Sequence, residues 1–336
     1  FTFGHVRQLD KVNSRLLANA WAAGAGPAAG EDLVVDLDST VTEVYGKAKH
    51  GASYGYTGVL GYHPLIATRA GTGEVLGSRM RKGAAGTSRG VIRFIGELLA
   101  TIGRAGVSGP VTVRADSGFW SWKLIDKLTH AGVGWSITVR LVTKVNNTIA
   151  AIPEADWVTI DYTRSGHAQV AETIYTTGTG KRARHVRLVV RRTRLADTAQ
   201  AAMWPTWRHH AFICNNTLTT VEADRFHRNH AIVELAIREL KDNGLEHCPS
   251  GSFPANGAWL ACAVAAHNLT RWAGIIGLDG PIRTARTIRN RLIALAGVLV
   301  NNSGTPTLRL PTDWPWAHQF HAALAAIRAI PNAGSP

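Results

Sequence analysis

The sequence predicts an α/β fold in which a mixed β-sheet is flanked by helices. Two observations lead to this prediction. Short β-branched runs alternate with amphipathic helical segments through the N-terminal part of the chain, and their order requires both parallel and antiparallel strand neighbours. Hydrophobic residues make up 45% of the 336-residue chain and charged residues 18%. This composition is typical of an ordered globular protein and excludes a disordered one.

The elements of the N-terminal part follow from local patterns. We expect a helix over residues 1–22 and a buried strand at LVVDLDST (33–40), which ends at polar residues. A Gly- and Tyr-rich loop leads to a predicted antiparallel pair, HPLIATRA and EVLGSRMRKG. TSRGVIRFIGELLATIGRAG predicts a helix with Thr87 or Ser88 as N-cap and Gly106 as its stop. PVTVRADSGF and WSITVRL are predicted strands on either side of a helix, SWKLIDKLTHAG.

From about residue 142 the pattern changes to successive β segments, which are WVTIDY, QVAETIYTT, RHVRLVVRRTRL and HHAFICNN. We interpret this stretch as a β-rich insertion. Predicted helices follow at HRNHAIVELAIRELK (227–241), NGAWLACAVAAHNLTRWAGII, a basic segment around RTARTIRNRLIALAGVLV, and the C-terminus. The resulting division is an N-terminal remnant (1–30), a core (31–141 and 221–275), the insertion (142–220) and a C-terminal helical region (276–336).

The charge balance favours a polyanionic partner. The chain has 37 Lys and Arg against 23 Asp and Glu, a formal charge of +14, and basic proteins bind nucleic acid through phosphate neutralisation and counterion release. Three cysteines without metal-type spacing fit a reducing cytoplasm. We see no apolar run of the ~20 residues that a membrane span needs. Because the first residue is Phe1 and not Met, we expect that an N-terminal segment precedes this sequence.

The helix predicted at residues 227–241 carries an unusual row of ionisable side chains. At about 100° per residue, His227, His230, Glu234, Arg238 and Lys241 fall within an arc of roughly 80°. An apolar stripe lies beside the row and supplies the buried face. A surface helix needs only that stripe and a mixed polar remainder, so the row indicates a site.

Two further carboxylates stand at the ends of predicted strands, Asp38 in DLDST and Asp116 in RADSGF. Ligand sites of α/β sheets gather at such strand ends. Together with Glu234 they form an oxygen-only donor set, which suits Mg²⁺ or Mn²⁺. Two such ions can serve phosphodiester chemistry. Two alternatives stay open: Asp36, on the same strand face, could replace Asp38, and either aspartate could simply cap a turn.

The helix also permits a zinc interpretation. His227, His230 and Glu234 have a spacing that places three ligands on one helix face. This spacing is less specific than the H-E-x-x-H motif, and no cysteine or further histidine is well placed nearby in sequence.

Taken together, DLDST, VRADSGFW and HRNHAIVELAIRELK resemble a bacterial insertion-sequence transposase of the DDE class. PSGSFPANGAWLACAVAAHNLTRW and LPTDWPW resemble the family's downstream segments, so the resemblance covers about residues 31 to 325. Relatives carry Y-x2-R-x3-E-x6-K on the catalytic helix. Glu234 and Lys241 match that motif, whereas histidines, His227 and His230, stand at the Tyr and Arg positions.

The resemblance implies an RNase H-like core interrupted by the β-rich insertion before the catalytic-Glu helix. It implies that Asp38, Asp116 and Glu234 hold two Mg²⁺ or Mn²⁺ ions. In the implied reaction, water nicks the element's end and the freed 3′-hydroxyl attacks target DNA. The implied partner is double-stranded DNA, both terminal inverted repeats and target, held by a homodimer in the nucleoid of the cytoplasm.

Basic residues outside the helix extend the expected DNA contacts. Seven of the fourteen residues from 181 to 194 are Lys or Arg, and Arg187 and Arg191 share one strand face. The alternative for that face is a solvated edge strand. Lys47, in the loop after the first strand, is a further candidate. Trp204 and Trp207 are placed to stack on an unpaired base or, alternatively, to pack in the core.

Two other functions fit the same residues. The chain could be an RNase H-like metal-dependent nuclease that cuts DNA without joining it. It could also be a catalytically decayed transposase that only binds DNA. The presence of all three carboxylates and of Lys241 favours the active transposase over the relic.

Overall fold

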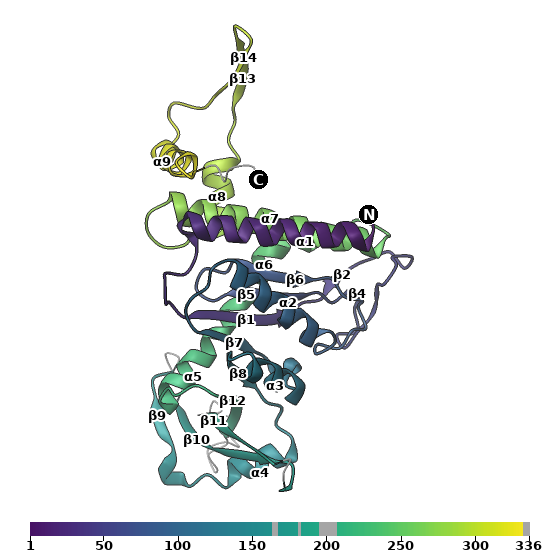
Figure 1. Ribbon diagram of the computed structural model, residues 1–336, viewed down its shortest axis with the longest axis vertical. Coiled ribbons are helices and arrows are strands. Elements are labelled where there is room, and N and C mark those ends of the chain that lie inside the picture. Colours follow the sequence, from purple (N-terminus) through teal and green to yellow (C-terminus); the bar gives the residue numbers. More distant parts are fainter. Residues whose placement is uncertain (163–166, 181–182, 195–206, 332–336) are drawn as a thin grey trace, which may run out of the picture.

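The computed structural model describes residues 1–162, 167–180, 183–194 and 207–331, and it has the α/β architecture that the sequence predicts (Figure 1). The strands of its large sheet are β1 (Leu33–Ser39), β5 (Leu65–Arg69), β6 (Val75–Arg79), β7 (Val111–Ala115), β8 (Gly134–Thr138), β9 (Val158–Ile160), β10 (Ala168–Thr177), β11 (Arg184–Arg194) and β12 (Trp207–Cys214). Their order in space is β6-β5-β1-β7-β8-β12-β11-β10-β9.

Helices pack around this sheet and, toward the C-terminus, on one another. They are α1 (Phe3–Ala20), α2 (Val91–Arg104), α3 (Trp122–His130), α4 (Thr143–Ala150), α5 (Thr220–Arg228), α6 (Val233–Leu240), α7 (Phe253–Gly277), α8 (Ala285–Ile288) and α9 (Ala317–Arg328). Short 3-10 turns are η2 (Ser117–Phe119), η3 (Glu154–Asp156) and η5 (Asn229–Ile232), and π turns are η1 (Trp21–Ala25), η6 (Lys241–Leu245) and η7 (Arg289–Ile293). No helix in these residue ranges is both long and apolar enough to cross a lipid bilayer.

The central strand β1 separates two packed layers. Its apolar residues Leu33, Val35 and Leu37 are fully buried in the main core, which α1, α2 and α3 complete. The residues between them lie on the opposite face of the sheet, where α6 packs on β1 and β5. β1 runs parallel to β7 and antiparallel to β5, so parallel and antiparallel neighbours meet at β1 as expected. Helices α1 and α7 lie side by side across the top of the sheet (Figure 1).

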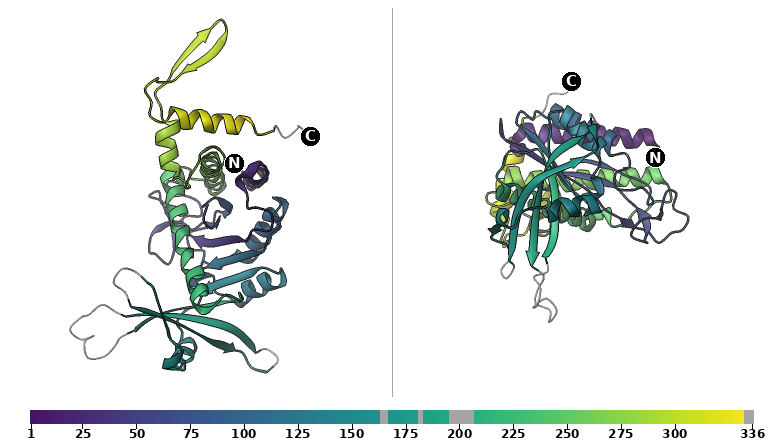
Figure 2. Two further views of the ribbon diagram at one scale, coloured as in Figure 1. Left: turned by 90° about the vertical axis from the view of Figure 1, so that its left-hand side faces the viewer. Right: turned by 90° about the horizontal axis from the view of Figure 1, so that it is seen from below.

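The β-rich insertion continues the same sheet. Strand β12 pairs antiparallel with β8, and β11, β10 and β9 follow in antiparallel order. Figure 2 shows this part at the end of the molecule opposite α1 and α7. The Gly- and Tyr-rich loop forms a small sheet of its own, β2 (Thr42–Glu43), β4 (Leu60–Tyr62) and β3 (Ser53–Tyr54).

The start of α2 differs from the prediction. Its N-cap is Gly90, in a left-handed conformation with φ 78°, and neither Thr87 nor Ser88 caps it. The physical reason is a competing contact. The buried guanidinium of Arg81 donates to the carbonyl oxygens of Gly86, Thr87 and Arg89, at 3.0, 2.8 and 3.1 Å, and so holds the preceding segment in a loop.

The helix predicted over residues 227–241 is interrupted. The chain passes from α5 through the 3-10 turn η5 into α6 and then into the π turn η6. Each change of winding rotates the following side chains relative to an ideal α-helix. The single polar row expected from a regular helix is therefore divided, and its members have different environments.

The basic helix predicted over RTARTIRNRLIALAGVLV is also shorter than expected. Helix α8 and turn η7 end at Ile293, and VLVNN then forms β13 (Val298–Asn302), which pairs with β14 (Thr305–Arg309). The β-branched valines beyond Gly297 favour the strand. This hairpin projects away from the body of the molecule (Figures 1 and 2).

Candidate active site

Two strand ends place the predicted aspartates at one edge of the sheet. Asp38 is the penultimate residue of β1, and Asp116 directly follows β7. The strands are parallel, with Asp36 opposite Arg114 and Leu37 opposite Ala115. Both carboxylates therefore emerge at the carboxyl ends of adjacent parallel strands, where α/β sheets bind ligands. Glu234 lies in the first turn of α6, which packs on β1.

The three carboxylates interact electrostatically. Asp38 is half-buried and accepts a hydrogen bond from the Ser39 amide at 2.6 Å. Burial raises the pKa of Asp38 to about 6, and the negative charges of Asp116 and Glu234 act in the same direction. Like charges within range of one another disfavour ionisation unless a cation is present. Within the described ranges, however, no three His, Cys, Asp or Glu side chains are close enough to enclose a metal ion.

Asp116 and Glu234 are both exposed. Asp116 caps the turn η2 and accepts a hydrogen bond from the Gly118 amide at 3.0 Å. This is the capping contact that the sequence left open as an alternative. It occupies one carboxylate oxygen only, so Asp116 keeps its other oxygen for a ligand.

Asp36 has a different role from Asp38. Its side chain is 1% exposed and forms a two-pronged ion pair with Arg114, at 2.7 and 2.8 Å. The Nδ1 atom of His230 lies 2.9 Å from the same carboxylate, and Arg114 also donates to the carbonyl oxygen of Phe226. We name these contacts of Asp36, Arg114, His230 and the Phe226 carbonyl the buried clamp. Because Asp36 is buried and both of its oxygens are bonded to Arg114, it does not fit the metal-ligand role that the sequence left open.

His227 does not face solvent, and the predicted contact of its side chain with DNA is wrong. It is 3% exposed and stacks on Phe212 with ring centroids 4.1 Å apart. Both ring nitrogens lie 2.8 Å from hydroxyl groups, those of Ser136 and Thr138. Burial lowers the pKa of His227 well below its ordinary value. The zinc interpretation is corrected for the same reason, since neither nitrogen of His227 is available to a metal.

The remaining members of the row differ in exposure. His230 is mostly buried and its Nδ1 atom contacts Asp36, so its contact with a DNA phosphate stays a prediction. Arg238 is exposed. The Nζ atom of Lys241 donates to the carbonyl oxygen of Val41 at 3.1 Å. Val41 follows β1, so this bond ties the end of α6 to the loop beyond Asp38. A cavity of about 290 Å³ lies there, and Lys241, Val41 and the exposed Tyr45 line it.

The two arginines predicted to track DNA in the insertion are occupied by other residues. Arg187 pairs with Glu172 at 2.5 Å and also donates to Asn216. Arg191, 9% exposed, pairs with Asp224 at 2.7 Å. Carboxylates of β10 and α5 thus pair with both arginines of the basic face expected from strand alternation, and its contact with DNA stays a prediction. Lys47, by contrast, is exposed.

The tryptophan predictions have separate outcomes. Trp207 lies 4.4 Å from the guanidinium of Arg192, which also lies 4.1 Å from the ring of Trp157. This stacking fits the packing alternative. Trp204 lies outside the described residues.

Sequence reasoning missed Arg114 and His63. His63 is fully buried, with Nε2 at 2.9 Å from the hydroxyl of Ser39, the neighbour of Asp38, and Nδ1 at 2.7 Å from the Ala85 carbonyl. Arg114 had a signal in the sequence, because it precedes Asp116 by two residues as Asp36 precedes Asp38. His63 had none, since its contacts join segments far apart in the chain.

A family model, transposase DDE domain group 1, matches residues 4–332. The chain belongs to this DDE transposase family. A search of curated proteins found no match for this DDE transposase. Among solved structures, it is similar to the piggyBac transposase in its synaptic complex with hairpin DNA, with 14% sequence identity and a TM-score of 0.44. That similarity covers 78% of this chain, which spans about half (52%) of the piggyBac chain.

Proposed function

We propose that this chain is the transposase of an insertion sequence, which cleaves DNA at the element's ends and joins the freed 3′ ends to target DNA. One observation carries the proposal. Asp38 and Asp116 emerge at the ends of adjacent parallel strands, and Glu234 lies in the first turn of a helix packed against one of them. Burial raises the pKa of Asp38, and the charges of Asp116 and Glu234 add to that effect. Family membership supports it.

The chemistry of the donor set fits divalent cations, whose binding would draw together three side chains that lie too far apart to enclose an ion in the described residues. The set consists of three carboxylates that repel one another, and oxygen ligands of this kind suit Mg²⁺ or Mn²⁺. We therefore assign Asp38, Asp116 and Glu234 as metal ligands. When bound, two such ions lower the pKa of the attacking water or 3′-hydroxyl and stabilise the leaving oxygen.

The chain's own residues orient these ligands and hold the substrate. The buried clamp joins β1, β7 and the α5–η5 segment. Its members Asp36 and Arg114 stand two residues before Asp38 and Asp116. Lys241 fixes the loop beyond Asp38. Exposed cations around the site, Lys47 and Arg238, contact the DNA backbone together with Lys241.

The core fold, the DNA partner and the pairing of two chains complete the proposed function. The strand order β6-β5-β1-β7-β8 supports an RNase H-like core, and residues 142–220 constitute the insertion. Double-stranded DNA is the partner, as terminal repeats and as target, and the +14 charge supports this. Two chains act together on paired DNA ends in the nucleoid.

The test uses the full chain with a supercoiled plasmid and a labelled oligonucleotide that carries a free 3′-hydroxyl, in Mn²⁺. We expect nicking of the plasmid and covalent joining of the oligonucleotide. Asp38→Asn, Asp116→Asn and Glu234→Gln should each abolish both reactions, because each removes a ligand. Asp242→Asn is the matched control, since it removes an exposed carboxylate from the same helical stretch.

Each other outcome selects a different function. Nicking without joining would indicate the RNase H-like nuclease. DNA binding without nicking by the unaltered protein would indicate the decayed transposase. Full activity of the Glu234→Gln variant would contradict the proposed site.

A further inference from the structure

A hollow of about 690 Å³ lies between α1, α2 and β6. Its ionisable lining is unbalanced in charge. Two carboxylates, Asp10 and Glu97, face a larger group of cations, which are Arg7, Lys11, Arg15, Arg79 and Arg104. The polar side chains of Asn13, Ser14 and Thr101 lie among them. We call this hollow the basic groove.

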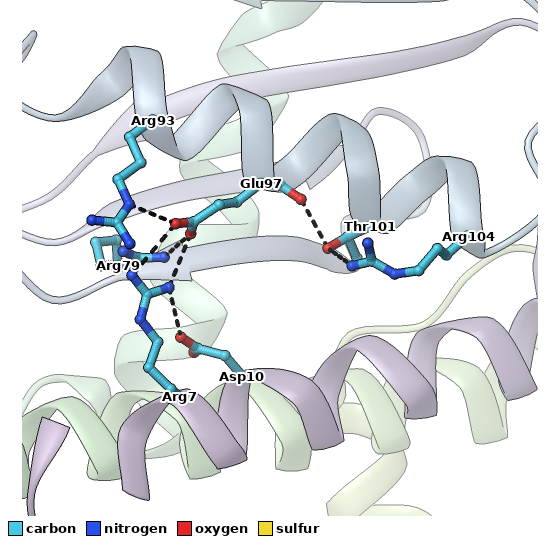
Figure 3. A network of polar contacts seen from close by, with 7 residues as sticks. All are labelled: Arg7, Asp10, Arg79, Arg93, Glu97, Thr101 and Arg104. Atoms are coloured by element: carbon cyan, nitrogen blue, oxygen red, sulfur yellow. Dashed lines mark hydrogen bonds and ion pairs between the residues drawn. The ribbon is translucent and has the colours of Figure 1, made fainter. Parts of the chain in front are cut away.

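A rigid network fixes one part of the groove (Figure 3). Glu97 accepts hydrogen bonds from Arg7 at 3.1 Å, from Arg93 at 2.9 Å and from Arg79. These residues come from α1, α2 and β6. Burial acts to raise the pKa of Glu97, but the three arginines lower it to about 2. The carboxylate thus stays ionised and holds three guanidinium groups together around one negative charge.

Other cations of the groove have no such partner. Lys11, Arg15 and Arg104 are exposed and form no ion pair within the described ranges. Lys11 and Arg15 lie one turn apart on α1, and Arg104 lies at the end of α2. Positive charge that its own chain does not neutralise is available to phosphate groups.

Helix α2 connects the groove to the proposed active site. A Cβ atom on Gly118, two residues after Asp116, would lie 2.8 Å from the side chain of Thr87. The loop before α2 therefore touches the loop that carries Asp116, and Arg81 holds it rigidly. Exposed Arg89 and Arg93 then lead along the first turn of α2 to the Glu97 network.

We propose that the basic groove binds the sugar–phosphate backbone of the DNA that leaves the active site past Asp116. This inference rests on the proposed function. DNA is the fitting occupant because Arg89 and Arg93 lie between the loop that touches the Asp116 loop and the Glu97 network, and the unpaired cations of the groove lie beyond that network. With 14 residues at 1.5 Å each, α2 is about 21 Å long, the rise of roughly six base pairs.

The test measures binding of a fluorescein-labelled DNA duplex by anisotropy over a range of salt concentrations, in EDTA. The groove variants are Lys11→Gln with Arg15→Gln, and Arg104→Gln. Lys11 and Arg15 lie outside the Glu97 network, and Arg104 joins it only through an exposed hydrogen bond to the Thr101 hydroxyl. Folding should therefore be preserved, which circular dichroism checks. The matched control is Arg309→Gln with Arg328→Gln, which removes two exposed cations outside the groove.

The slope of log affinity against log salt should become shallower by about 0.9 for each phosphate contact that is lost. For the double groove variant we expect a change of about 1.8. The control should keep the wild-type slope. Equal losses in both would overturn the proposal, because binding would then depend only on net charge. The groove variants should also lose none of the slope on a duplex shortened by about six base pairs at the end that contacts the groove. A loss of slope that persists on this shorter duplex would overturn the proposal.

A second probe addresses an acidic protein partner. If fluorescein-labelled poly-glutamate bound as tightly as DNA, and lost its affinity in the groove variants, the groove would be a protein site and the proposal would fail. Because all binding is measured in EDTA, cleavage does not influence it. Failure of the groove and failure of the proposed transposase activity are therefore distinguishable.

Discussion

At the scale of single residues, neighbouring aspartates of one strand acquire different chemistry from their partners. Asp36 is paired with Arg114 and contacts His230, whereas Asp38 accepts only a backbone hydrogen bond. The pairing of Asp36 with Arg114 was predictable, since two parallel strands that end in aspartates at equivalent positions place the preceding residues side by side. The burial of His227 was not, because its hydroxyl partners lie on a strand distant in sequence.

The clamp makes a prediction about stability. Asp36→Asn and Arg114→Met should each cost about 3–5 kcal/mol of unfolding free energy, because each leaves an unpaired charge in a buried position. The double variant should cost much less than the sum. Urea unfolding of the four proteins measures the coupling. Additive losses would contradict a clamp in which the two side chains depend on each other.

The burial of His227 should make the stability of the protein depend on pH. Burial keeps its pKa below the ordinary value of 6.5 in the folded state, so the unfolded chain binds the extra proton as pH falls below 6.5. Stability should therefore decrease with acidification in that range. His210, whose pKa burial lowers to about 4, adds to the same slope.

The check is urea unfolding of the wild type and His227→Gln between pH 7.5 and 5.5. The variant should be less stable at pH 7.5, since Gln forms neither the stack on Phe212 nor both hydroxyl contacts. Its stability should also fall less steeply with pH. An unchanged slope would mean that His227 accepts a proton in the folded state.

At the scale of elements, the sequence located the helices and strands well but not their irregularities. The strands β1, β7 and β8 and the helices α2 and α3 lie where periodicity placed them. The interruption at η5 follows from tertiary contacts, since Phe226, before it, and His230, within it, are both held by the buried clamp. A pattern of apolar positions carries no information about such contacts, so a regular helix was predicted.

Glu97 should stabilise the packing of these elements, because it joins α1, α2 and β6. Glu97→Gln should lower the stability of the protein near neutral pH. The pKa of Glu97 is depressed to about 2 from 4.5, so its stabilising contribution is present above pH 4.5 and is lost as pH falls toward 2. Thermal unfolding at pH 7 and pH 3 should show a smaller difference between variant and wild type at pH 3. A constant difference would contradict the account.

At the scale of the whole molecule, the insertion and the core share one sheet. The sequence predicted the β segments of the insertion, but not that β12 would pair with β8, because strand alternation does not identify a strand's neighbour. The continuity matters for the site. Helix α5, which packs on the insertion strands β10 and β11, leads through η5 to Glu234.

The hairpin β13–β14 makes a prediction about the whole fold. Val298, Leu299 and Leu308 are 63%, 72% and 60% exposed, so the hairpin contributes little to the packed core. Replacing residues 298–309 by a short Gly-Asn turn should leave the melting temperature nearly unchanged. A decrease of more than about 4 °C, corresponding to roughly 1 kcal/mol or more, would show that the hairpin stabilises the body.

The central claim is that Asp38, Asp116 and Glu234 together hold divalent metal ions. Titration calorimetry with Mn²⁺ on the full chain tests it most directly, with Glu234→Gln as the variant and Asp242→Asn as its control. We predict that one or two ions bind per chain, that Glu234→Gln loses this binding and that Asp242→Asn keeps it. Binding that is unaltered in Glu234→Gln, or absent from the wild type, would contradict the account.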